Sequence, residues 1–375
     1  MIPTLASLDR ASLAGFDEIV DVRTPAEFAR DQVPGAVNLP VLSDAERAKV
    51  GAIYVQESRL EARRVGAALV ARNIAAHLEG ALKDKAGAYA PLIYCWRGGQ
   101  RSHAMATVLS QVGWRPTVIA GGYKTYRRRV TASLYDAEPG FRVILLDGDT
   151  GSAKTEILGA LREAGVQTLD LEGLAAHRGS LFGAVAGHPQ PSQPLFESRL
   201  LAALDRLDPA RPILVEAESS KIGELNVPPT LWRAMAAAPR IELRAPRDRR
   251  ARYLVGAYRD IVEDRDRLEE VLGRLPGRHG KKRLAEWRAM ARAGAFEALA
   301  EALMEAHYDP AYERSRRADA RPPFGVVAME SLEPAGLRAA AGQVGALARA
   351  IGAAGRDTAR SNSRGPQPCR PTPSA

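Results

Sequence analysis

The sequence predicts an α/β protein made of two consecutive parallel-sheet units, the second of which ends in a helical, basic portion. Short apolar runs alternate with segments of helical period over the first 130 residues, as is typical of a parallel sheet. A new apolar run at 141–147 leads into a glycine-rich turn and starts a second alternation. The chain has 375 residues, 46% of them hydrophobic, which is enough to bury two cores.

In the first unit, which we place at residues 1–130, apolar runs predict three strands, and periodicity predicts two helices. One helix is expected around Ser58–Ala76, and the other starts near Arg101 with its inner face formed by Met105, Val108, Leu109 and Val112. The predicted strands are Glu18–Val22, Pro91–Cys95 and Pro116–Ala120.

We place the second unit at residues 138–345, with a pattern that becomes helical and heavily charged from Arg247 to His307. Its predicted strands are residues 141–147, 167–169, 212–215 and 240–243. Gly273–Gly280 is expected to be a loop between helices. The Arg-, Ser-, Pro- and Gly-rich end has almost no large apolar residues, so a disordered tail is predicted at 346–375.

Composition limits the class of protein and its partners. The formal charge of +9 favours a polyanionic partner, although the abundance of Ala, Arg and Gly also fits a GC-rich genome. Two widely separated cysteines form no disulfide framework, which favours a reducing cytoplasm. No apolar run is long enough for a membrane span, and the N-terminus lacks the pattern of a signal peptide. We therefore expect a cytoplasmic protein with no membrane partner.

Cys95 ends a predicted strand and is followed by a glycine-rich turn and a predicted helix, in the stretch IYCWRGGQRS. The N–H groups of a first helical turn, together with Arg97 and Arg101, would stabilise a thiolate. Gly98 and Gly99 let backbone N–H groups form an anion-binding nest. We predict a nucleophilic cysteine with Arg97 and Arg101 as its catalytic partners; the alternative is a buried, inert cysteine.

The spacing Cys-x5-Arg occurs in two chemistries, phosphatases that attack phosphorus and rhodanese-like domains that carry sulfur or selenium. Two segments upstream of Cys95 and one downstream resemble rhodanese-like domains. They are DVRTPAEF from Asp21, PGAVNLP from Pro34, and Gly121-Gly122-Tyr123 after the next predicted strand. The resemblance covers the whole first unit and implies a rhodanese-like fold.

Residues 148–155, GDTGSAKT, match a Walker A phosphate loop except that Ala153 replaces the second glycine. An apolar strand before the loop and a helical pattern after it favour ligand binding over an empty turn. Backbone N–H groups would hold a diphosphate, Lys154 would offset its charge, and the hydroxyl of Thr155 could hold Mg²⁺. The predicted phosphate-binding residues are Gly148, Thr150, Gly151, Ser152, Lys154 and Thr155.

Glu216 and Glu218 end the predicted strand at 212–215, where phosphate-loop proteins place a general base or a Mg²⁺-linked carboxylate. Strand alternation would put both side chains on one face. Solvated charges at the end of a strand are the alternative. The spacing of His177, His188 and His307 does not predict a metal site, and we expect no tightly bound cofactor.

Between residues 239 and 292 there are 16 Lys or Arg against 9 Asp or Glu. Such a surface could neutralise nucleic-acid phosphates, or it could be a solvated helix surface with i,i+4 ion pairs. The candidate nucleic-acid-binding residues are Arg178, Arg249, Arg250, Lys281, Lys282 and Arg283.

The order of the two units, a rhodanese-like domain followed by a phosphate-loop domain, resembles the tRNA 2-selenouridine synthase family. Motifs between and beyond the two loops extend the resemblance from about residue 15 to residue 317. These are HRGSLFG from His177, QPSQ from Gln190, Phe196-Glu197, EAES from Glu216, Ile222-Gly223 and HYDPAY from His307. Two departures are Gln32, where histidine is frequent, and Ala153.

The resemblance implies a transferase acting on 2-thiouridine at the wobble position of tRNA. Geranyl diphosphate would alkylate the sulfur at the phosphate loop, and selenophosphate, delivered by a selenophosphate synthetase, would then supply selenium. Cys95 would handle the selenium, either as a perselenide or by assisting the attack. Two alternatives remain: a sulfurtransferase or Cys-x5-Arg phosphatase fused to a small-molecule kinase without RNA, and a nucleotide-regulated RNA-binding scaffold.

Overall fold

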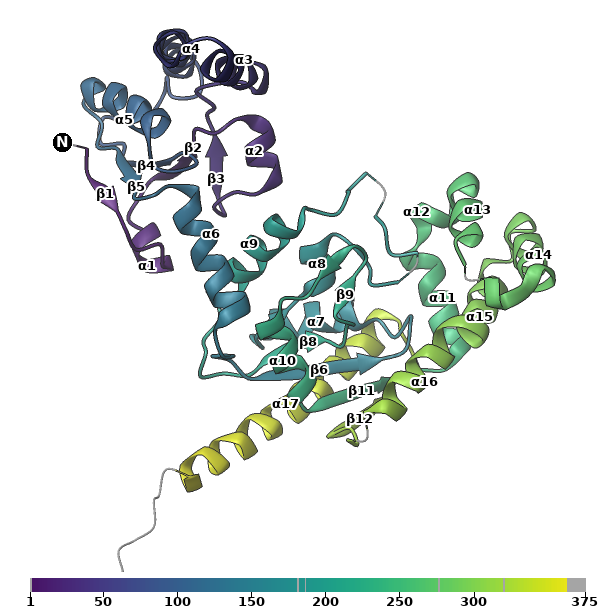
Figure 1. Cartoon of the computed structure of the whole chain (residues 1–375). Coiled ribbons are helices and arrows are strands. Elements are labelled where there is room, and N and C mark those ends of the chain that lie inside the picture. The colour runs from purple at the N-terminus through teal and green to yellow at the C-terminus, as the bar shows by residue number, and fades with distance from the viewer. Residues whose placement is uncertain (1, 181, 186, 276, 320, 363–375) are drawn as a thin grey trace, which may run out of the picture. The chain divides into compact units, whose positions relative to one another are not determined.

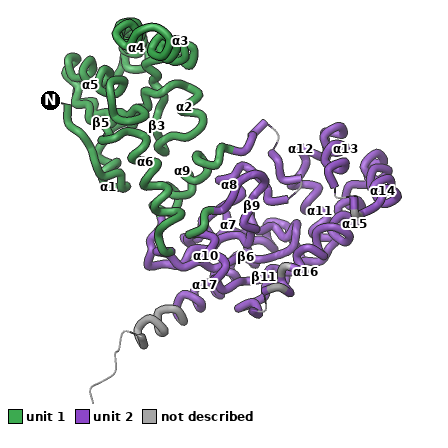
Figure 2. The backbone as a smooth tube through the Cα atoms, in the orientation of Figure 1, with its two compact units in different colours: residues 1–138, 191–206, 228–230 green, residues 139–190, 207–227, 231–375 purple. Residues whose placement is uncertain are grey.

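The computed structural model describes residues 2–362 apart from 181, 186, 276 and 320. The chain forms two compact units (Figure 2). Unit 1 comprises residues 1–138, 191–206 and 228–230, and unit 2 comprises 139–190, 207–227 and 231–375. Both units are α/β, as the sequence predicts, and each is built on its own parallel sheet.

The sheet of unit 1 has five parallel strands in the order β1-β5-β4-β2-β3 (Figure 1). The three predicted strands are confirmed as β2, β4 and β5. Its strands are β1 (Thr4–Leu5), β2 (Glu18–Asp21), β3 (Ala36–Asn38), β4 (Pro91–Tyr94) and β5 (Thr117–Ile119). Asp21 lies opposite both Tyr94 and Asn38, so the carboxyl ends of β2, β3 and β4 meet at one edge, directly before Cys95.

Eight helices accompany this sheet in the described part of unit 1. The predicted helix at 58–76 is α4, capped by the Ser58 side chain, and the one near Arg101 is α5. On α5, Met105 and Leu109 are buried, but Val112 is 51% exposed because the helix ends there, before Gly113. The helices are α1 (Arg10–Leu13), α2 (Pro25–Arg30), α3 (Asp44–Gln56), α4 (Arg59–Glu79), α5 (Gln100–Val112), α6 (Tyr123–Thr131), a π-helical turn at Ala132–Asp136 and α9 (Gln193–Leu204).

The compact unit 1 extends beyond the predicted residues 1–130 in two respects. Unit 1 continues to Glu138, because α6 runs on into the π-helical turn. It also includes α9, which lies inside the predicted phosphate-loop domain. Glu197 of α9 is buried and accepts hydrogen bonds from Arg127 of α6 and from the hydroxyl of Tyr135 at 2.6 Å. A contact so distant in sequence leaves no local pattern.

The sheet of unit 2 has five parallel strands in the order β12-β11-β6-β8-β7. The four predicted strands are confirmed, whereas the edge strand β12 was not predicted. They are β6 (Val143–Gly148), β7 (Thr168–Leu169), β8 (Ile213–Glu216), β11 (Arg240–Arg244) and β12 (Gly325–Ala328). A separate antiparallel pair consists of β9 (Lys221–Ile222) and β10 (Leu225–Asn226).

The helices of unit 2 form two groups around this sheet. Ile144, Ile157 and Val344 belong to one core, which joins the sheet to α7 and α17, and Leu268, Trp287 and Leu299 belong to a second core among α13, α14 and α15. The helices are α7 (Lys154–Glu163), α8 (Leu171–Ala175), α10 (Pro229–Ala237), α11 (Arg247–Ala257), α12 (Arg259–Val262), α13 (Arg265–Gly273), α14 (Gly280–Arg292), α15 (Phe296–Leu303), a π-helical turn at Met304–Tyr308, α16 (Asp309–Ala318) and α17 (Pro334–Asn362).

The predicted disordered tail at 346–375 is wrong for residues 346–362, which belong to α17. Alanine is the best helix former, and its small side chain can still be buried against a neighbour. Ala340, Ala341 and Ala348 are buried in the core that α17 shares with α7. The rest of the predicted tail, 363–375, lies outside the described residues. No helix in the described part of the chain is long and apolar enough to cross a membrane.

Candidate active sites

Cys95 directly follows β4, and its loop leads into the first turn of α5. Its sulfur is almost completely buried, accepts a hydrogen bond from the N–H of Gly99 at 3.2 Å, and lies 3.3 Å from Oγ of Ser102. Burial alone would raise the pKa of the Cys95 thiol. Hydrogen bonds from the Ser102 side chain and from neighbouring backbone N–H groups outweigh burial, so the pKa is lowered. This arrangement favours the reactive thiolate.

The glycine pair at the start of α6 supports the Cys95 loop. The N–H groups of Tyr123 and Lys124 donate to the carbonyls of Cys95 and Trp96 at 2.9 and 3.1 Å. Gly122 has a φ of +60°, and a Cβ there would collide with the carbonyl oxygen of Cys95. Only glycine therefore fits this position. The Gly-Gly-Tyr motif thus holds the backbone of the thiol loop in place.

The two predicted catalytic arginines occupy different environments. Arg101 donates to Glu27 of α2 at 2.8 Å, so the motif residue Glu27 holds this guanidinium beside the loop. Arg97 is exposed and forms no ion pair with any residue in the described part of the chain. Both arginines line a pocket that also contains Cys95. Their catalytic roles remain predictions, and Arg97 is the cation more readily available to an anionic ligand.

The phosphate loop connects β6 to α7 and forms despite Ala153. Ala153 adopts the left-handed conformation with a φ of +56°, the conformation that a glycine would take without strain. Lys154 begins α7, and its Nζ donates to the carbonyl of Gly148 at 3.0 Å. Burial would lower the pKa of Lys154, but nearby acidic groups, Tyr312 and Glu218 foremost, outweigh it and raise the pKa. The lysine is therefore charged and positioned in the loop.

Arg250 was predicted to contact tRNA, but its side chain is only 5% exposed. It donates to the carbonyl of Thr150 in the phosphate loop at 3.0 Å and to Asp309 at 2.9 Å. Asp309 belongs to the HYDPAY motif, so its ion pair with Arg250 holds this motif next to the phosphate loop. Arg250 therefore braces the phosphate loop, and its predicted tRNA contact is wrong because the side chain is not accessible.

A cluster of three carboxyl groups lies beside Lys154. The predicted residues Glu216 and Glu218 do not share a face, because β8 ends at Glu216 and the chain then turns. Glu218 lines the phosphate-loop pocket, whereas Glu216 is buried and accepts from the N–H of Glu172 at 2.7 Å. The third member, Glu172, accepts from the hydroxyl of Thr155 at 3.3 Å. Sequence reasoning missed Glu172, although it lies just after the neighbouring strand β7.

Burial and mutual repulsion raise the pKa values of two of these carboxyl groups. Burial, followed by the charges of Glu218 and Glu216, raises the pKa of Glu172 to about 9. Burial also raises the pKa of Glu216 to about 8. Its Oε2 atom has no hydrogen-bond partner among the described residues. The site thus holds neutral carboxyl groups at neutral pH next to a charged lysine.

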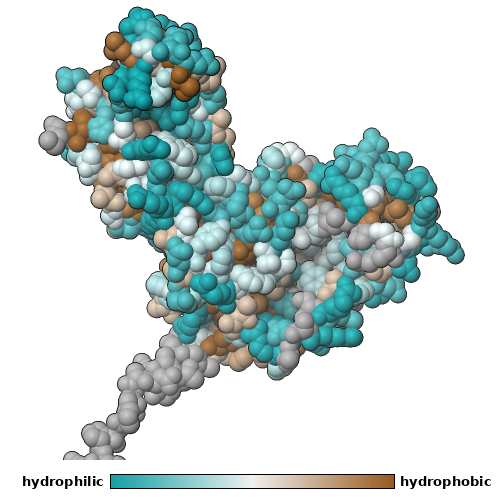
Figure 3. Space-filling view, viewed as in Figure 1, coloured by the Kyte–Doolittle hydropathy of each residue, from teal (hydrophilic) through white to brown (hydrophobic). Residues whose placement is uncertain are grey.

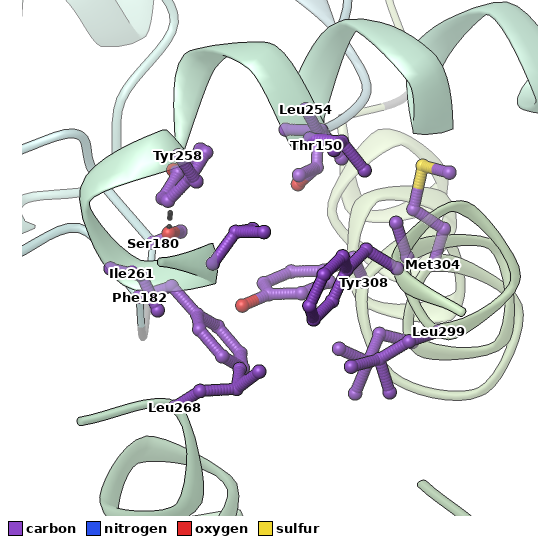
Figure 4. Close-up of a pocket in the computed structure, with 15 residues that line it drawn as sticks. Thr150, Ser180, Phe182, Leu254, Tyr258, Ile261, Leu268, Leu299, Met304 and Tyr308 are labelled. Atoms are coloured by element: carbon purple, nitrogen blue, oxygen red, sulfur yellow. Dashed lines mark hydrogen bonds between the residues drawn. The ribbon is translucent and has the colours of Figure 1, made fainter. Parts of the chain in front are cut away.

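Two pockets of opposite character meet at the phosphate loop. A polar pocket of about 320 Å³ is lined by the loop, Glu172, Glu218 and Tyr312. An apolar pocket of about 80 Å³ lies between α11, α13 and α15 and is shown in Figure 4. Thr150, Ser180, Leu254 and Tyr258 line both pockets. The hydrogen bond between Ser180 and Tyr258, 3.0 Å long, marks this boundary (Figure 4).

The other predicted tRNA-binding residues lie in different settings. Arg178 lines the phosphate-loop pocket, pairs with Asp260 at 3.0 Å and stacks on Tyr258. Arg249 is exposed and lies 3.5 Å from Asp248. Lys281, Lys282 and Arg283 are exposed in the first turn of α14. Within the described residues, no group of three or more His, Cys, Asp or Glu side chains could hold a metal ion.

The fold and the two loops define a class of protein in which a rhodanese-like thiol domain is joined to a phosphate-loop domain. Family models agree with this division: a rhodanese-like domain matches residues 4–129, and the AAA domain of tRNA 2-selenouridine synthase matches residues 141–328. The chain is 36% identical to the tRNA 2-selenouridine synthase of Chromohalobacter salexigens, over 83% of this chain and 90% of the relative. It is 34% identical to that of Cupriavidus necator, over 84% and 92%. The chain belongs to the tRNA 2-selenouridine synthase family.

Proposed function

We propose that this protein converts 2-thiouridine at the wobble position of tRNA into 2-selenouridine in two steps. Geranyl diphosphate alkylates the sulfur at the phosphate loop, and selenium from selenophosphate then replaces the alkylated sulfur with the help of Cys95. Membership of the family supports the overall reaction. The observation that carries the first step is the junction of the phosphate-loop pocket with an apolar pocket.

This junction suits a ligand with an anionic head and an apolar tail. A nucleoside triphosphate would place a polar sugar and base beyond its phosphates, whereas the apolar pocket is lined by Phe182, Leu254, Leu299 and Met304. The loop N–H groups and Lys154 match a diphosphate. Burial of prenyl carbons would add roughly 0.8 kcal/mol for each CH₂ group.

In the alkylation step, the sulfur of 2-thiouridine attacks C1 of geranyl diphosphate. The C1–O bond breaks, diphosphate leaves with the electron pair, and the nucleoside loses its N3 proton. Lys154 stabilises the charge that develops on diphosphate. Glu218, which lines the pocket and has a carboxyl partner in Glu172, is the candidate acceptor for the N3 proton.

Mg²⁺ is compatible with this site, because it usually takes one or two protein ligands together with substrate phosphates. The hydroxyl of Thr155 and the carboxyl of Glu172 lie 3.3 Å apart, and Glu216 has an unpartnered oxygen behind them. Thr155 and the ionised form of Glu172 are therefore the groups that would hold the ion, and binding of Mg²⁺ would displace the proton of Glu172. When bound, Mg²⁺ would neutralise part of the diphosphate charge.

In the replacement step, the selenium of selenophosphate adds to C2 of the nucleoside, and geranyl thiolate leaves with the electron pair of the C2–S bond. N3 regains a proton, the thiolate takes up a proton, and water removes phosphorus from selenium as phosphate. Alkylation makes sulfur a better leaving group, which explains why it comes first. The lowered thiol pKa and the exposed Arg97 support a role for the Cys95 loop in handling this anionic donor, delivered by a selenophosphate synthetase.

tRNA is the substrate that the exposed cations of α14 support best. Lys281, Lys282 and Arg283 lie in the first turn of a helix, where the helix dipole disfavours positive charge. A polyanion bound there would offset this unfavourable placement. Phosphate contacts by these side chains predict strongly salt-dependent tRNA binding.

Competition binding tests whether the phosphate loop binds the diphosphate group while the apolar pocket binds the prenyl chain. The affinities of the full-length protein for geranyl diphosphate and for inorganic diphosphate are measured for the wild type, Phe182→Ala and Lys154→Ala. We expect Phe182→Ala to weaken geranyl diphosphate binding about tenfold and to leave diphosphate binding unchanged, because Phe182 lines only the apolar pocket. Lys154→Ala should weaken both. Equal loss of both ligands in Phe182→Ala would contradict the assignment.

A further inference from the structure

The pocket beside Cys95 is much larger than a selenophosphate anion requires. Its volume is about 910 Å³, and the Cys95 loop forms only one of its walls. The opposite wall comes from α3 and α4 and is largely apolar. The apolar lining residues that α3 and α4 contribute are Val50, Tyr54, Ala62, Ala67 and Val70.

The helices α3 and α4 expose several apolar side chains, of which Tyr54 lines this pocket. α3 has no buried residue, yet its chain carries Tyr54, which is 49% exposed, and Val55, which is 83% exposed. Leu60 at the start of α4 is 77% exposed. Hydrophobic side chains accordingly appear among hydrophilic ones on the surface of the α3 and α4 pair (Figure 3). Asn73 of α4 donates a hydrogen bond to Glu46 of α3 at 2.8 Å, which links the two helices.

Cationic side chains line the same pocket. Arg47 and Arg63 are exposed and, like Arg97, form no ion pair with another residue in the portion of the chain that the structure describes. The pocket therefore combines a nucleophilic thiol, an apolar wall and three accessible cations. An anionic ligand with an apolar group complements all three features, whereas selenophosphate has no apolar surface for Val50, Tyr54 or Val70 to cover.

We propose that this pocket binds the S-geranyl group of the alkylated nucleoside against α3 and α4, while Arg47 and Arg63 contact phosphates of the same RNA strand. The inference rests on the proposed function and assigns a second prenyl-binding site, distinct from the one at the phosphate loop. Burial of the prenyl group presents C2 of the nucleoside to the Cys95 loop. Under this proposal, unit 1 binds alkylated tRNA in preference to its unalkylated precursor.

Binding of anticodon stem-loops to the full-length protein tests this site. The probes carry S-geranyl-2-thiouridine or S-methyl-2-thiouridine at the wobble position, and the variants are Val50→Glu, Tyr54→Glu and Val55→Glu. Val55→Glu is the matched control, because Val55 lies on the same helix but does not line the pocket. α3 contributes no buried side chain, so these substitutions should not unfold the protein. Circular dichroism checks that each variant remains folded.

We expect a preference of the wild type for the geranyl probe of about tenfold or more, from burial of prenyl carbons. Val50→Glu and Tyr54→Glu should reduce this preference severalfold and slow selenium incorporation, whereas Val55→Glu should not. A photoreactive S-prenyl probe should label α3 or α4 in the wild type. Labelling confined to the apolar pocket of unit 2, or identical behaviour of Tyr54→Glu and Val55→Glu, would overturn the inference.

The rate at which the same proteins geranylate thiolated tRNA distinguishes a failure of this inference from a failure of the proposed function. All three variants should alkylate tRNA at the wild-type rate, because the phosphate-loop site lies in unit 2. A wild-type protein that cannot alkylate thiolated tRNA contradicts the proposed function itself. Normal alkylation and selenium incorporation in Val50→Glu and Tyr54→Glu contradict only the second prenyl-binding site.

Discussion

The Ser102 side chain lowers the pKa of Cys95 more than any other group near the thiol. Its hydroxyl lies 3.3 Å from the sulfur and is the leading cause that lowers the thiol pKa. Ser102→Ala should therefore raise the pKa of Cys95, and Ser102→Thr should restore it. The pH dependence of thiol alkylation by iodoacetamide measures this pKa. An unchanged profile in Ser102→Ala would show that the backbone N–H groups suffice.

Glu172 and Glu216 make stability depend on pH. Their folded-state pKa values, about 9 and about 8, lie above the ordinary value of 4.5. The stabilising contribution of their protonation is therefore complete below about pH 4.5. This contribution is lost as pH rises through the folded-state pKa values. The free energy of unfolding should fall between about pH 5 and pH 9.

The double variant Glu172→Gln/Glu216→Gln isolates this effect, because glutamine resembles the neutral carboxyl group. Between pH 5 and pH 9, the free energy of unfolding of the variant should fall less than that of the wild type. The difference between the two falls should be at least about 1 kcal/mol. Urea denaturation at several pH values measures the difference. Parallel profiles for the two proteins would contradict the raised pKa values.

Ala153 is a residue at which the sequence departs from the phosphate-loop pattern and the structure shows the consequence. Because its backbone is left-handed, Ala153→Gly should raise the free energy of unfolding by about 1 kcal/mol. Thermal denaturation checks this. A destabilised Ala153→Gly variant would mean that the methyl group, which is buried, contributes more through packing than the backbone conformation costs.

At the scale of secondary structure elements, we expect α9 to stabilise unit 1 through the ion pair between Glu197 and Arg127. Arg127→Ala would leave the buried carboxylate of Glu197 without its cation, which should cost about 3 kcal/mol of unfolding free energy. The exposed neighbour Arg128 provides the control, since Arg128→Ala should change stability by less than about 0.5 kcal/mol. Equal effects of the two substitutions in urea denaturation would contradict this role of α9.

Strands and helices with strong local patterns could be predicted from the sequence. β4, β6 and α4 follow apolar runs or helical periodicity, and the two loops follow fixed motifs. The short strand β12 could not be predicted, because it is defined only by pairing with β11. α17 was underestimated because its buried face consists largely of alanine. Local sequence patterns therefore predict individual strands and helices, but not the contacts that these make with segments far away in the chain.

The candidate sites show the same division between local motif and distant contact. Cys95, Lys154 and Glu218 were predicted because they lie in contiguous patterns, and the structure places each at a pocket. Glu172 was missed and Arg250 misassigned, because their positions depend on pairing between segments far apart in the chain. The apolar pocket likewise combines side chains from α11, α13 and α15, which no single motif contains.

At the scale of the whole molecule, each of the two units carries its own candidate site for an anionic ligand, and the two sites differ chemically. A phosphate loop with an apolar neighbour suits a prenyl diphosphate, and a thiol loop with an apolar wall suits the alkylated nucleoside. The central claim is that these sites act in sequence on one nucleoside of tRNA.

Mass spectrometry of the wobble nucleoside, after incubation of thiolated tRNA with geranyl diphosphate and selenophosphate, tests this claim most directly. The wild type should produce 2-selenouridine through S-geranyl-2-thiouridine. Lys154→Ala should leave 2-thiouridine largely unmodified, and Cys95→Ser should accumulate the S-geranyl nucleoside. Formation of 2-selenouridine by Cys95→Ser at the wild-type rate, or undiminished geranylation by Lys154→Ala, would contradict the account.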